Sequence, residues 1–512
     1  MIYINGRDLT LEQVIQVARG GEKVAMTEES KAAVKKAREY VDQKLKEKAV
    51  IYGLTTGFGE FSKVYIPQEL TATLQRNLII SHACGMGEPL PEQVVRAAML
   101  LRCNALSKGN SGIRLSTIET MLNMLNKGVH PVIPEKGSLG ASGDLAPLSH
   151  IVLVMLGEGE AYYKGVRMSG KLAMKKAGIP TIELAAKEGL ALINGTQIMM
   201  GVACNVVWDA LDLMKTADIA AAMTTEAQLG IKKAFDHKVH DVRGHKGQKD
   251  AAANLLQILE GSQLALDLNP DKVQDAYAIR CTPQIHGASR DAIEYVYGVI
   301  SREINAVTDN PIIFPDEDEA ISGGNFHGQP IALAMDFLGI ALAEYANVSE
   351  RRLERMVNPT LSNGLPAFLT RQGGVNSGFM IAQYAAASMV SENKVYAHPA
   401  SVDSIPSSAN QEDIVSMGTT AARTAGMIVQ NTLDCLALEL MTACQAIDIR
   451  RRLNTHGQGI TPLHQAIYDR VRQEVPFYDL DREIWPEIDA VKKMIYSGEI
   501  LEIAKEHIPD LY

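Results

Sequence analysis

The chain has 512 residues, of which 46% are hydrophobic, and this is enough for a large core in two to four domains or in one multi-helix body. Its 50 Lys and Arg residues and 60 Asp and Glu residues give a net charge of −10 without a concentrated basic block, which excludes nucleic acid and anionic membranes as expected partners. The six cysteines lack Cys-x-x-Cys spacing, so we expect reduced thiols in a cytoplasmic protein, without a disulfide or zinc framework.

The N-terminal part predicts a short strand and turn in residues 1–9, without the pattern of a signal peptide, and a helix in residues 27–48. Thr27 is a suitable N-cap, and the acidic residues that follow it interact favourably with the helix dipole. Residues 51–59 contain three glycines, which disfavour a helix and predict a loop. Taken alone, Tyr52 in this loop is expected to be a structural residue.

Helical patterns follow in residues 74–83, in residues 93–127 with a break near 109–112, and in residues 145–155. His82 lies near the end of the first of these helices. A core histidine with a satisfied ring is as good an interpretation of this residue as a functional one. After the third helix, residues 156–166 predict a small β-ribbon that turns at Lys164-Gly165.

Residues 137–143 form a glycine-rich loop that contains the tripeptide Ala141-Ser142-Gly143. Glycine permits positive φ and close backbone approach, so the amide nitrogen of Gly143 can be bent back onto the carbonyl carbon of Ala141. Ring closure and loss of two waters, one of them from the Ser142 side chain, would leave an exocyclic methylidene. That group would be a carbon electrophile, which no ordinary side chain supplies. The alternative is an ordinary turn.

The rest of the chain is dominated by long helical patterns with few breakers, many of them apolar nearly all round. We therefore expect a mainly α protein: a bundle of long helices, joined to others by oligomerisation, with a smaller N-terminal domain that carries the cofactor loop and short β-ribbons. The expected domains are residues 1–200 and 201–512. The expected long helices are residues 198–228, 290–308, 330–357, 378–397 and 411–448.

Two interpretations from other functional classes remain open. Residues 235–245 contain three histidines, His237, His240 and His245, which could serve a metal-dependent hydrolase. Their spacing matches no closed zinc pattern, and two nearby basic residues add positive charge, so a surface loop is favoured over a metal site. The second interpretation is a helical scaffold without catalytic activity, in which the tripeptide would stay uncyclised.

The whole stretch Gly-Ser-x-Gly-Ala-Ser-Gly-Asp-Leu-Ala-Pro-Leu-Ser-His at residues 137–150 resembles the signature of the aromatic amino acid ammonia-lyases and aminomutases. Residues 51–59, 189–197, 308–311, 322–329 and 408–413 resemble further blocks of this family, so the resemblance spans nearly the whole chain. It implies a 4-methylidene-imidazol-5-one formed from Ala141-Ser142-Gly143, with no metal or dissociable cofactor.

The resemblance also implies roles for individual residues. Tyr52 would take the Cβ proton, which requires a lowered phenol pKa. Arg280 would hold the substrate carboxylate with its planar guanidinium. The other implied site residues are Asn194 beside the ring, Tyr277 and Gln274 in the site wall, and Phe326 against the cofactor. Taken alone, Asn194 is an ordinary turn residue, and Gln274, Tyr277 and Arg280 share one helical face only if a helix persists there, with Pro283 ending it.

The substrate implied by the resemblance is L-histidine, which would lose ammonia to give trans-urocanate. Ser81-His82 resembles the pair in histidine-specific members, and the carboxylate of Glu412 can bind the N–H of an imidazole. Two departures, Thr55 and Ile414, keep a tyrosine (or phenylalanine) ammonia-lyase or an aromatic aminomutase open as alternatives.

The family forms tetramers of paired dimers in which several chains build each site. The resemblance therefore implies a homotetramer with composite active sites, with the ring and Asn194 from one chain and Tyr52 or Arg280 from others. The expected partner is a small aromatic amino acid.

Overall fold

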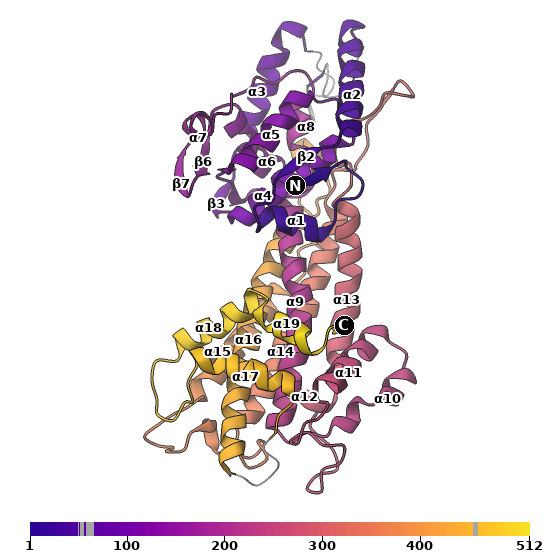
Figure 1. Ribbon diagram of the computed structural model, residues 1–512. Coiled ribbons are helices and arrows are strands. Elements are labelled where there is room, and N and C mark those ends of the chain that lie inside the picture. The colour runs from indigo at the N-terminus through magenta and orange to yellow at the C-terminus, as the bar shows by residue number, and fades with distance from the viewer. Residues whose placement is uncertain (50, 52–55, 58–65, 454–458) are drawn as a thin grey trace. The chain divides into compact units, whose positions relative to one another are not determined.

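A computed structural model describes residues 1–512 except 50, 52–55, 58–65 and 454–458. The described chain is mainly helical, with short strands only, so the predicted fold class is confirmed (Figure 1). It forms two compact units. Unit 1 comprises residues 1–208, 297–336 and 399–423, and unit 2 comprises residues 209–296, 337–398 and 424–512. The first boundary lies close to the expected one at residue 200, but two later stretches of chain also belong to unit 1.

Unit 1 contains the strands, all of three or four residues. β1 (Ile2–Ile4) pairs with β2 (Val24–Met26) in parallel, and the other pairs are antiparallel. The predicted ribbon at Lys164-Gly165 is present as β6 and β7, which extend a three-stranded sheet begun by β4. The remaining strands are β3 (Met86–Pro89) with β5 (Pro134–Lys136), β4 (Val129–Pro131) with β6 (Glu160–Tyr163) and β7 (Val166–Ser169), and β8 (Ile312–Phe314) with β9 (Glu319–Ile321).

The N-terminal helices begin at side-chain caps. The Thr27 hydroxyl accepts from the amide of Ser30 at 3.2 Å and starts α2, as predicted. A helix absent from the sequence prediction, α1, begins at Thr10, which forms a capping box with Gln13. The helices up to residue 193 are α1 (Leu11–Ala18), α2 (Glu28–Lys46), α3 (Thr71–His82), α4 (Glu92–Ser107), α5 (Leu115–Lys127), α6 (Leu145–Met155), α7 (Gly170–Lys176) and α8 (Glu188–Ile193).

The predicted long helices are present, and two of them begin seven or eight residues before or after the expected position. One starts at 282 instead of 290 because Pro283, expected to end a helix, lies in the first turn of a new one, where its missing N–H is harmless. Another starts at 418 instead of 411, because Met417 has a left-handed φ of 55° that breaks the helix. These helices are α9 (Gln197–Ala227), α13 (Thr282–Glu303), α14 (Gln329–Val357), α15 (Met380–Tyr396) and α16 (Gly418–Leu453).

Shorter helices complete the described chain. Most of them belong to unit 2. They are α10 (His237–Asp241), α11 (Lys246–Ile258), α12 (Tyr277–Arg280), α17 (Pro462–Glu474), α18 (Trp485–Tyr496) and α19 (Glu499–His507), with 3₁₀ turns η2 (Gln68–Leu70), η3 (Lys232–Phe235), η4 (Ala367–Leu369) and η5 (Ser408–Asn410).

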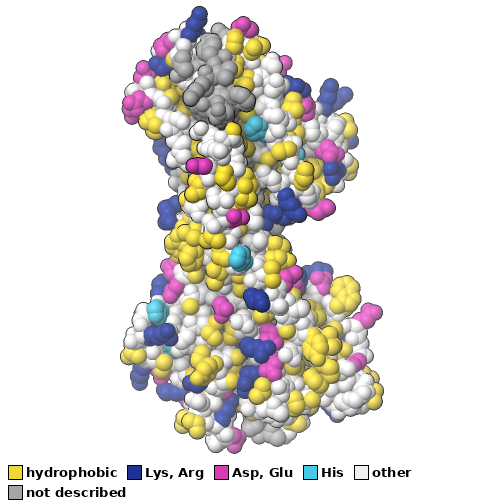
Figure 2. All heavy atoms as spheres, turned by 180° about the vertical axis from the view of Figure 1, so that it is seen from behind, with side chains coloured by type: hydrophobic (Ala, Val, Ile, Leu, Met, Phe, Trp, Pro, Cys, Tyr) yellow, Lys and Arg dark blue, Asp and Glu magenta, His cyan; other side chains and the backbone are white. Residues whose placement is uncertain are grey.

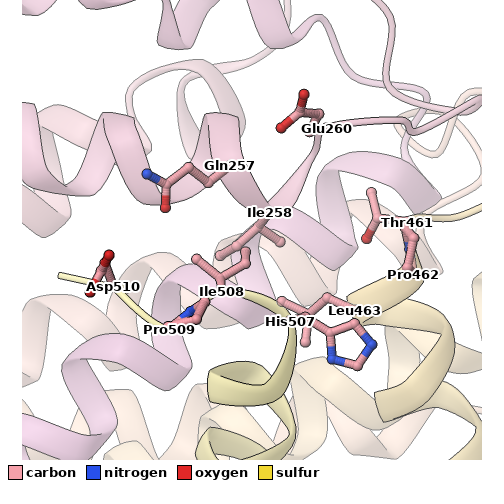
Figure 3. A pocket seen from close by; sticks show the side chains of 10 residues that line it. All are labelled: Gln257, Ile258, Glu260, Thr461, Pro462, Leu463, His507, Ile508, Pro509 and Asp510. Carbon is pink, nitrogen blue, oxygen red and sulfur yellow. The ribbon is translucent and has the colours of Figure 1, made fainter.

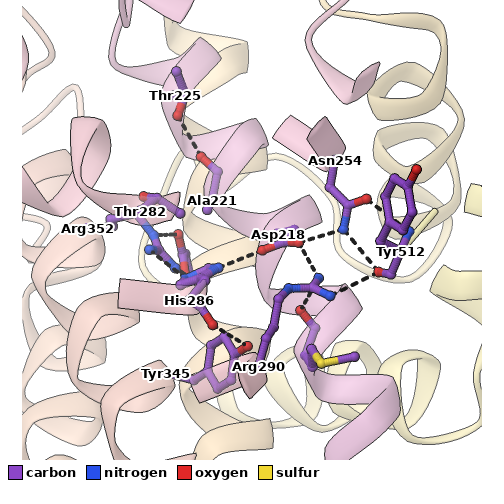
Figure 4. A network of polar contacts seen from close by, with 12 residues as sticks. Asp218, Ala221, Thr225, Asn254, Thr282, His286, Arg290, Tyr345, Arg352 and Tyr512 are labelled. Carbon is purple, nitrogen blue, oxygen red and sulfur yellow. Dashed lines mark hydrogen bonds and ion pairs between the residues drawn. The ribbon is translucent and has the colours of Figure 1, made fainter. Parts of the chain in front are cut away.

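Unit 2 contains a polar network whose members Asp218, Asn254 and His286 are fully buried (Figure 4). Asp218 accepts from His286 Nδ1 at 2.6 Å and from Asn254 Nδ2 at 2.8 Å, and it also pairs with Arg290. Arg290 and Asn254 both donate to the backbone carbonyl of Tyr512. Burial of these polar groups is tolerated because most of them have a partner, although Arg290 Nε has none within the described chain.

One described helix, α14, is long and apolar enough to cross a membrane by length and composition alone. Within the structure, 67% of its most apolar window is buried. A core helix of a folded domain has the same properties.

Candidate active site

The glycine-rich loop before α6 requires its glycines. Gly140 and Gly143 have φ of 68° and 70°, in the left-handed region. A Cβ on Gly143 would lie 2.2 Å from the carbonyl oxygen of Gly195, and one on Gly140 would lie 2.2 Å from Ser416 Oγ. The predicted glycine-rich loop is therefore present, and two other chain segments pack closely against its buried residues Gly140 and Gly143.

Asp144 anchors this loop. Its side chain is fully buried and accepts four hydrogen bonds: from Ser138 Oγ at 2.7 Å, Thr419 Oγ1 at 2.6 Å and the amides of Ile198 and Met199 at 2.9 and 2.8 Å. The last two lie in the first turn of α9, where free amides favour a negative charge. Burial raises the pKa of Asp144, and the hydrogen bonds oppose that rise.

Asn194 lies against the tripeptide. Its Nδ2 donates to both the carbonyl oxygen and the hydroxyl of Ser142, each at 2.9 Å. Gly195, the next residue, accepts from the amide of Asp144 at 2.7 Å and pairs with Gly143 in an isolated parallel bridge. The connection between α8 and α9 therefore runs alongside the loop and presents an amide donor to its central residue.

A cavity of about 460 Å³ opens over this arrangement in unit 1. It brings together five of the residues singled out from the sequence: Ala141, Ser142, Asn194, Phe326 and Glu412. Phe326 is half-buried in this lining. The other lining residues are Leu190, Asn310, Ser322, Gly323, His327, Gln411, Asp413 and Ile414.

Glu412 is the predicted side chain that gives this cavity an acidic group. Its backbone amide donates to Ser407 O, and its carbonyl accepts from the amide of Ser407, so the residue is held by a short bridge. Burial raises the pKa of the Glu412 carboxyl above its usual range. Ile414, one of the two departures from the histidine pattern, also lines the cavity, with 63% of its surface exposed.

The other predicted residues of the N-terminal part are placed differently. His82 is the last residue of α3, with its Nδ1 3.1 Å from Ser81 Oγ, and does not line the cavity over Ser142. Burial lowers the pKa of its imidazole. Tyr52 and Thr55 lie outside the described residues.

Gln274, Tyr277 and Arg280 belong to unit 2. They do not share a helical face, because α12 spans only Tyr277–Arg280 and Gln274 precedes it. The guanidinium of Arg280 lies 4.7 Å from the centre of the Tyr277 ring, and Tyr277 is 69% exposed. Arg280 and Gln274 line a separate cavity of about 570 Å³ within unit 2.

A sequence model of the aromatic amino acid lyase family matches residues 9–473. The chain belongs to the aromatic amino acid lyase family. The histidine ammonia-lyase of Alkaliphilus metalliredigens is 59% identical over 501 residues, which cover 98% of each chain. The crystal structure of histidine ammonia-lyase from Trypanosoma cruzi is 42% identical, with a TM-score of 0.92 over 99% of this chain and 96% of that one. A tyrosine aminomutase from Streptomyces globisporus is 37% identical, with a TM-score of 0.93 over 99% and 98%.

Residues 235–245 are the histidine-rich segment that was considered as a metal site. They include the last residue of η3 and the whole of α10. His240 is fully buried, and both of its ring nitrogens have partners: Gln248 Nε2 at 2.9 Å and the carbonyl of Ala234 at 3.2 Å. Among the described residues, no group of three or more His, Cys, Asp or Glu side chains is arranged to hold a metal ion.

Unit 2 contains another cavity of about 400 Å³ beside the C-terminal segment (Figure 3). Its lining includes Glu260, His507 and Asp510 but none of the residues predicted to be functional.

Sequence reasoning missed the groups that fix the loop from a distance. Ser416 Oγ donates to Gly140 O at 2.9 Å, and Thr419 binds Asp144 from 275 residues away. Asp144 could have been found from the sequence, because it belongs to the signature and stands between a glycine and the start of α6. No local sequence pattern marks Ser416 or Thr419 as groups that fix the loop.

Proposed function

We propose that this protein is a histidine ammonia-lyase, which eliminates ammonia from L-histidine to give trans-urocanate. The observation that carries the proposal is the cavity over Ser142, which is lined by the tripeptide, by Asn194 hydrogen-bonded to it, and by Glu412. The names of the curated relatives support the same substrate, because they match the chain over nearly its full length.

We propose further that Ala141-Ser142-Gly143 forms a methylidene-imidazolone. The residues present fit this group. Gly143 leaves room for nothing beyond hydrogen on the side of Gly195, so its backbone can approach closely, and Asn194 already donates to the Ser142 carbonyl that would belong to the ring. Such a ring supplies an electrophilic carbon that turns the substrate amine into a better leaving group.

The chain's own groups then stabilise charge and hold substrate. Asn194 Nδ2 stabilises negative charge on the Ser142 oxygen, because a fixed donor inside a partly enclosed site needs no reorganisation. Glu412, in carboxylate form, accepts the N–H of the substrate imidazole. The raised pKa of Glu412 means that this form is lost at a higher pH than for an exposed glutamate.

The remaining roles are proposed from the family pattern. Tyr52 removes the Cβ proton, Arg280 holds the carboxylate, and His82 contacts the imidazole. Tyr277 and Gln274 complete the wall of the site and Phe326 packs against the cofactor.

Among the described residues that line the cavity over Ser142, there is no arginine or tyrosine. This supports a composite site, in which other chains supply such groups. We therefore propose a homotetramer. Unit 2 exposes large apolar side chains that association would cover, and Figure 2 shows such side chains across one face of the molecule. The exposed apolar side chains of unit 2 include Tyr295, Phe337, Ile340, Ile381, Tyr384 and Val395, which are 47–66% exposed.

We also propose a cytoplasmic location. All six cysteines are free, and four of them are buried, as expected of thiols that remain reduced. The tyrosine-specific lyase or aminomutase stays the second candidate, because Ile414 adds an apolar surface beside Glu412 in the cavity.

The test is direct. Purified protein is incubated separately with L-histidine, L-tyrosine and L-phenylalanine while ammonia and the ultraviolet spectrum of each product are recorded. We expect ammonia and the urocanate spectrum with histidine, at a kcat/KM above those for the other two. A higher kcat/KM for tyrosine, or a β-amino acid as product, would overturn the proposal.

A further inference from the structure

We propose that Arg102, on α4, is a positioning residue for Asn194; this rests on the proposed lyase function. The Arg102 side chain is 1% exposed. Its Nη1 donates to Gln197 Oε1 at 2.8 Å, and its Nη2 donates to the carbonyl of Ala191. These two partners stand on either side of Asn194 in the chain, one in α8 and the other at the start of α9.

Gly195 shows how closely the guanidinium supports this connection. A Cβ on Gly195 would lie 2.3 Å from Arg102 Nη1, 2.4 Å from Gln197 Oε1 and 2.7 Å from Thr308 Oγ1. The same connection also contacts the glycine-rich loop. Asn194 donates to Ser142, and Gly195 accepts from the amide of Asp144. Arg102 therefore supports, from within the core, the segment whose other contacts form the site.

Further hydrogen bonds fix the side chain of Gln197, one of the two partners of Arg102. Gln197 Nε2 donates to Thr308 Oγ1 at 2.9 Å, which fixes the amide so that its oxygen faces Arg102. Next along the chain from Thr308, Asp309 forms a buried ion pair with Lys187 at 2.7 Å. Within the described chain, Arg102 itself has no carboxylate in ion-pair contact, and its Nε has no hydrogen-bond partner.

A buried guanidinium without a direct counter-ion is costly, so a protein retains it where its position matters. Burial lowers the pKa of Arg102 to about 10, so it remains charged at neutral pH. The bonds to Ala191 and Gln197 fix the turn that aims the Asn194 amide at Ser142. A shift of about 1 Å in such a group lowers a rate by on the order of 10²-fold.

The experiment compares Arg102→Met and Arg102→Lys with Arg96→Met. Arg96 is a matched control because it is also on α4 and 7% exposed, yet it donates to the carbonyls of Val17 and Leu125. We expect Arg102→Met to lower kcat for histidine about 10²-fold with little change in KM, and Arg102→Lys, which keeps one charged donor, to recover part of that loss. Arg96→Met should keep the wild-type kcat despite a similar loss of thermal stability.

Two readouts, kcat and intact mass, make the result decisive. Intact mass gives the fraction of chains that have lost two waters, and this fraction does not depend on substrate. If the wild type fails with histidine, the proposed substrate is wrong, and a lower dehydrated fraction in Arg102→Met than in Arg96→Met still supports the positioning role. A folded Arg102→Met protein with wild-type kcat and mass, or equal kcat losses in both Met variants, overturns it. If Arg102→Met does not fold, Arg102→Lys decides by the same kcat and mass comparison.

Discussion

Removing the carboxylate of Glu439 should destabilise unit 2 far more than replacing both Glu439 and its ion-pair partner Arg352 by apolar residues. Glu439, in α16, and Arg352, in α14, both have fully buried side chains. Arg352 donates to both carboxylate oxygens, at 2.9 Å for Nη2 to Oε2, and Thr224 Oγ1 donates to Oε1 at 2.8 Å. Glu439→Ala would leave a buried guanidinium without its counter-ion and a buried hydroxyl without its acceptor.

The expected magnitude follows from this burial. Breaking a buried pair by removing one partner costs about 3–5 kcal/mol, whereas an apolar pair of similar volume is neutral or more stable. For a unit of about 150–250 residues, each kcal/mol shifts the unfolding midpoint by roughly 2–4 °C. We therefore expect Glu439→Ala to lower the midpoint by roughly 6–20 °C, and the double variant Arg352→Met/Glu439→Leu to stay near the wild type or above it.

The assay is thermal unfolding followed by circular dichroism at a fixed scan rate and protein concentration. A surface control is Glu160→Ala, which breaks the exposed pair with Arg167 and should change stability by less than about 1 kcal/mol. The reasoning is refuted if Glu439→Ala melts within about 2 °C of the wild type. It is also refuted if the double variant melts as low as the single one.

Three predictions concern the proposed chemistry. Ser142→Ala should fold but lose nearly all activity, and its intact mass should lack the loss of two waters seen in the wild type; an active variant at full mass would contradict the cofactor. Burial raises the pKa of Glu412, so wild-type kcat/KM for histidine should fall on the acid side at a pH above the usual carboxyl range. Glu412→Gln should flatten this acid limb of the pH profile. An acid limb that is unchanged in the variant would assign it to another group. Co-expression of Ser142→Ala with Arg280→Met should restore part of the activity that each variant lacks, whereas mixed tetramers without activity would argue against shared sites.

The sequence could predict the active loop because the relevant signal is local. Gly140 and the tripeptide that ends at Gly143 are consecutive in the chain, and their small size already indicates a tight backbone turn. The family and the mainly α fold are confirmed for the same reason: long runs of helical periodicity and complete motifs persist without tertiary information. Glu412 and Asn194 were placed by resemblance, and the cavity holds both.

Other features depend on contacts that no local pattern reveals. α1 was missed although Thr10 and Gln13 form a capping box, because its eight residues give a short periodic pattern. The start of α16 was predicted too early, since a left-handed φ at Met417 is not visible in the sequence. The helix that would have placed Gln274, Tyr277 and Arg280 on one face does not extend to Gln274. The helix α12 is a single turn that begins at Tyr277, because helical spacing of side chains does not ensure that a helix forms.

The assembly of unit 1 from three separated stretches of chain has a consequence for biosynthesis. Thr419 and Ser416, which close over Asp144 and Gly140, are made about 275 residues after them. At roughly 5–20 residues per second, a ribosome needs about 15–55 s to add that length. During that interval the loop of the nascent chain lacks these restraints, so the order of translation itself delays the compact geometry around the tripeptide. An electrophile that arises only after nearly the whole polypeptide has emerged would be kept away from the thiols and amines that surround unfinished chains.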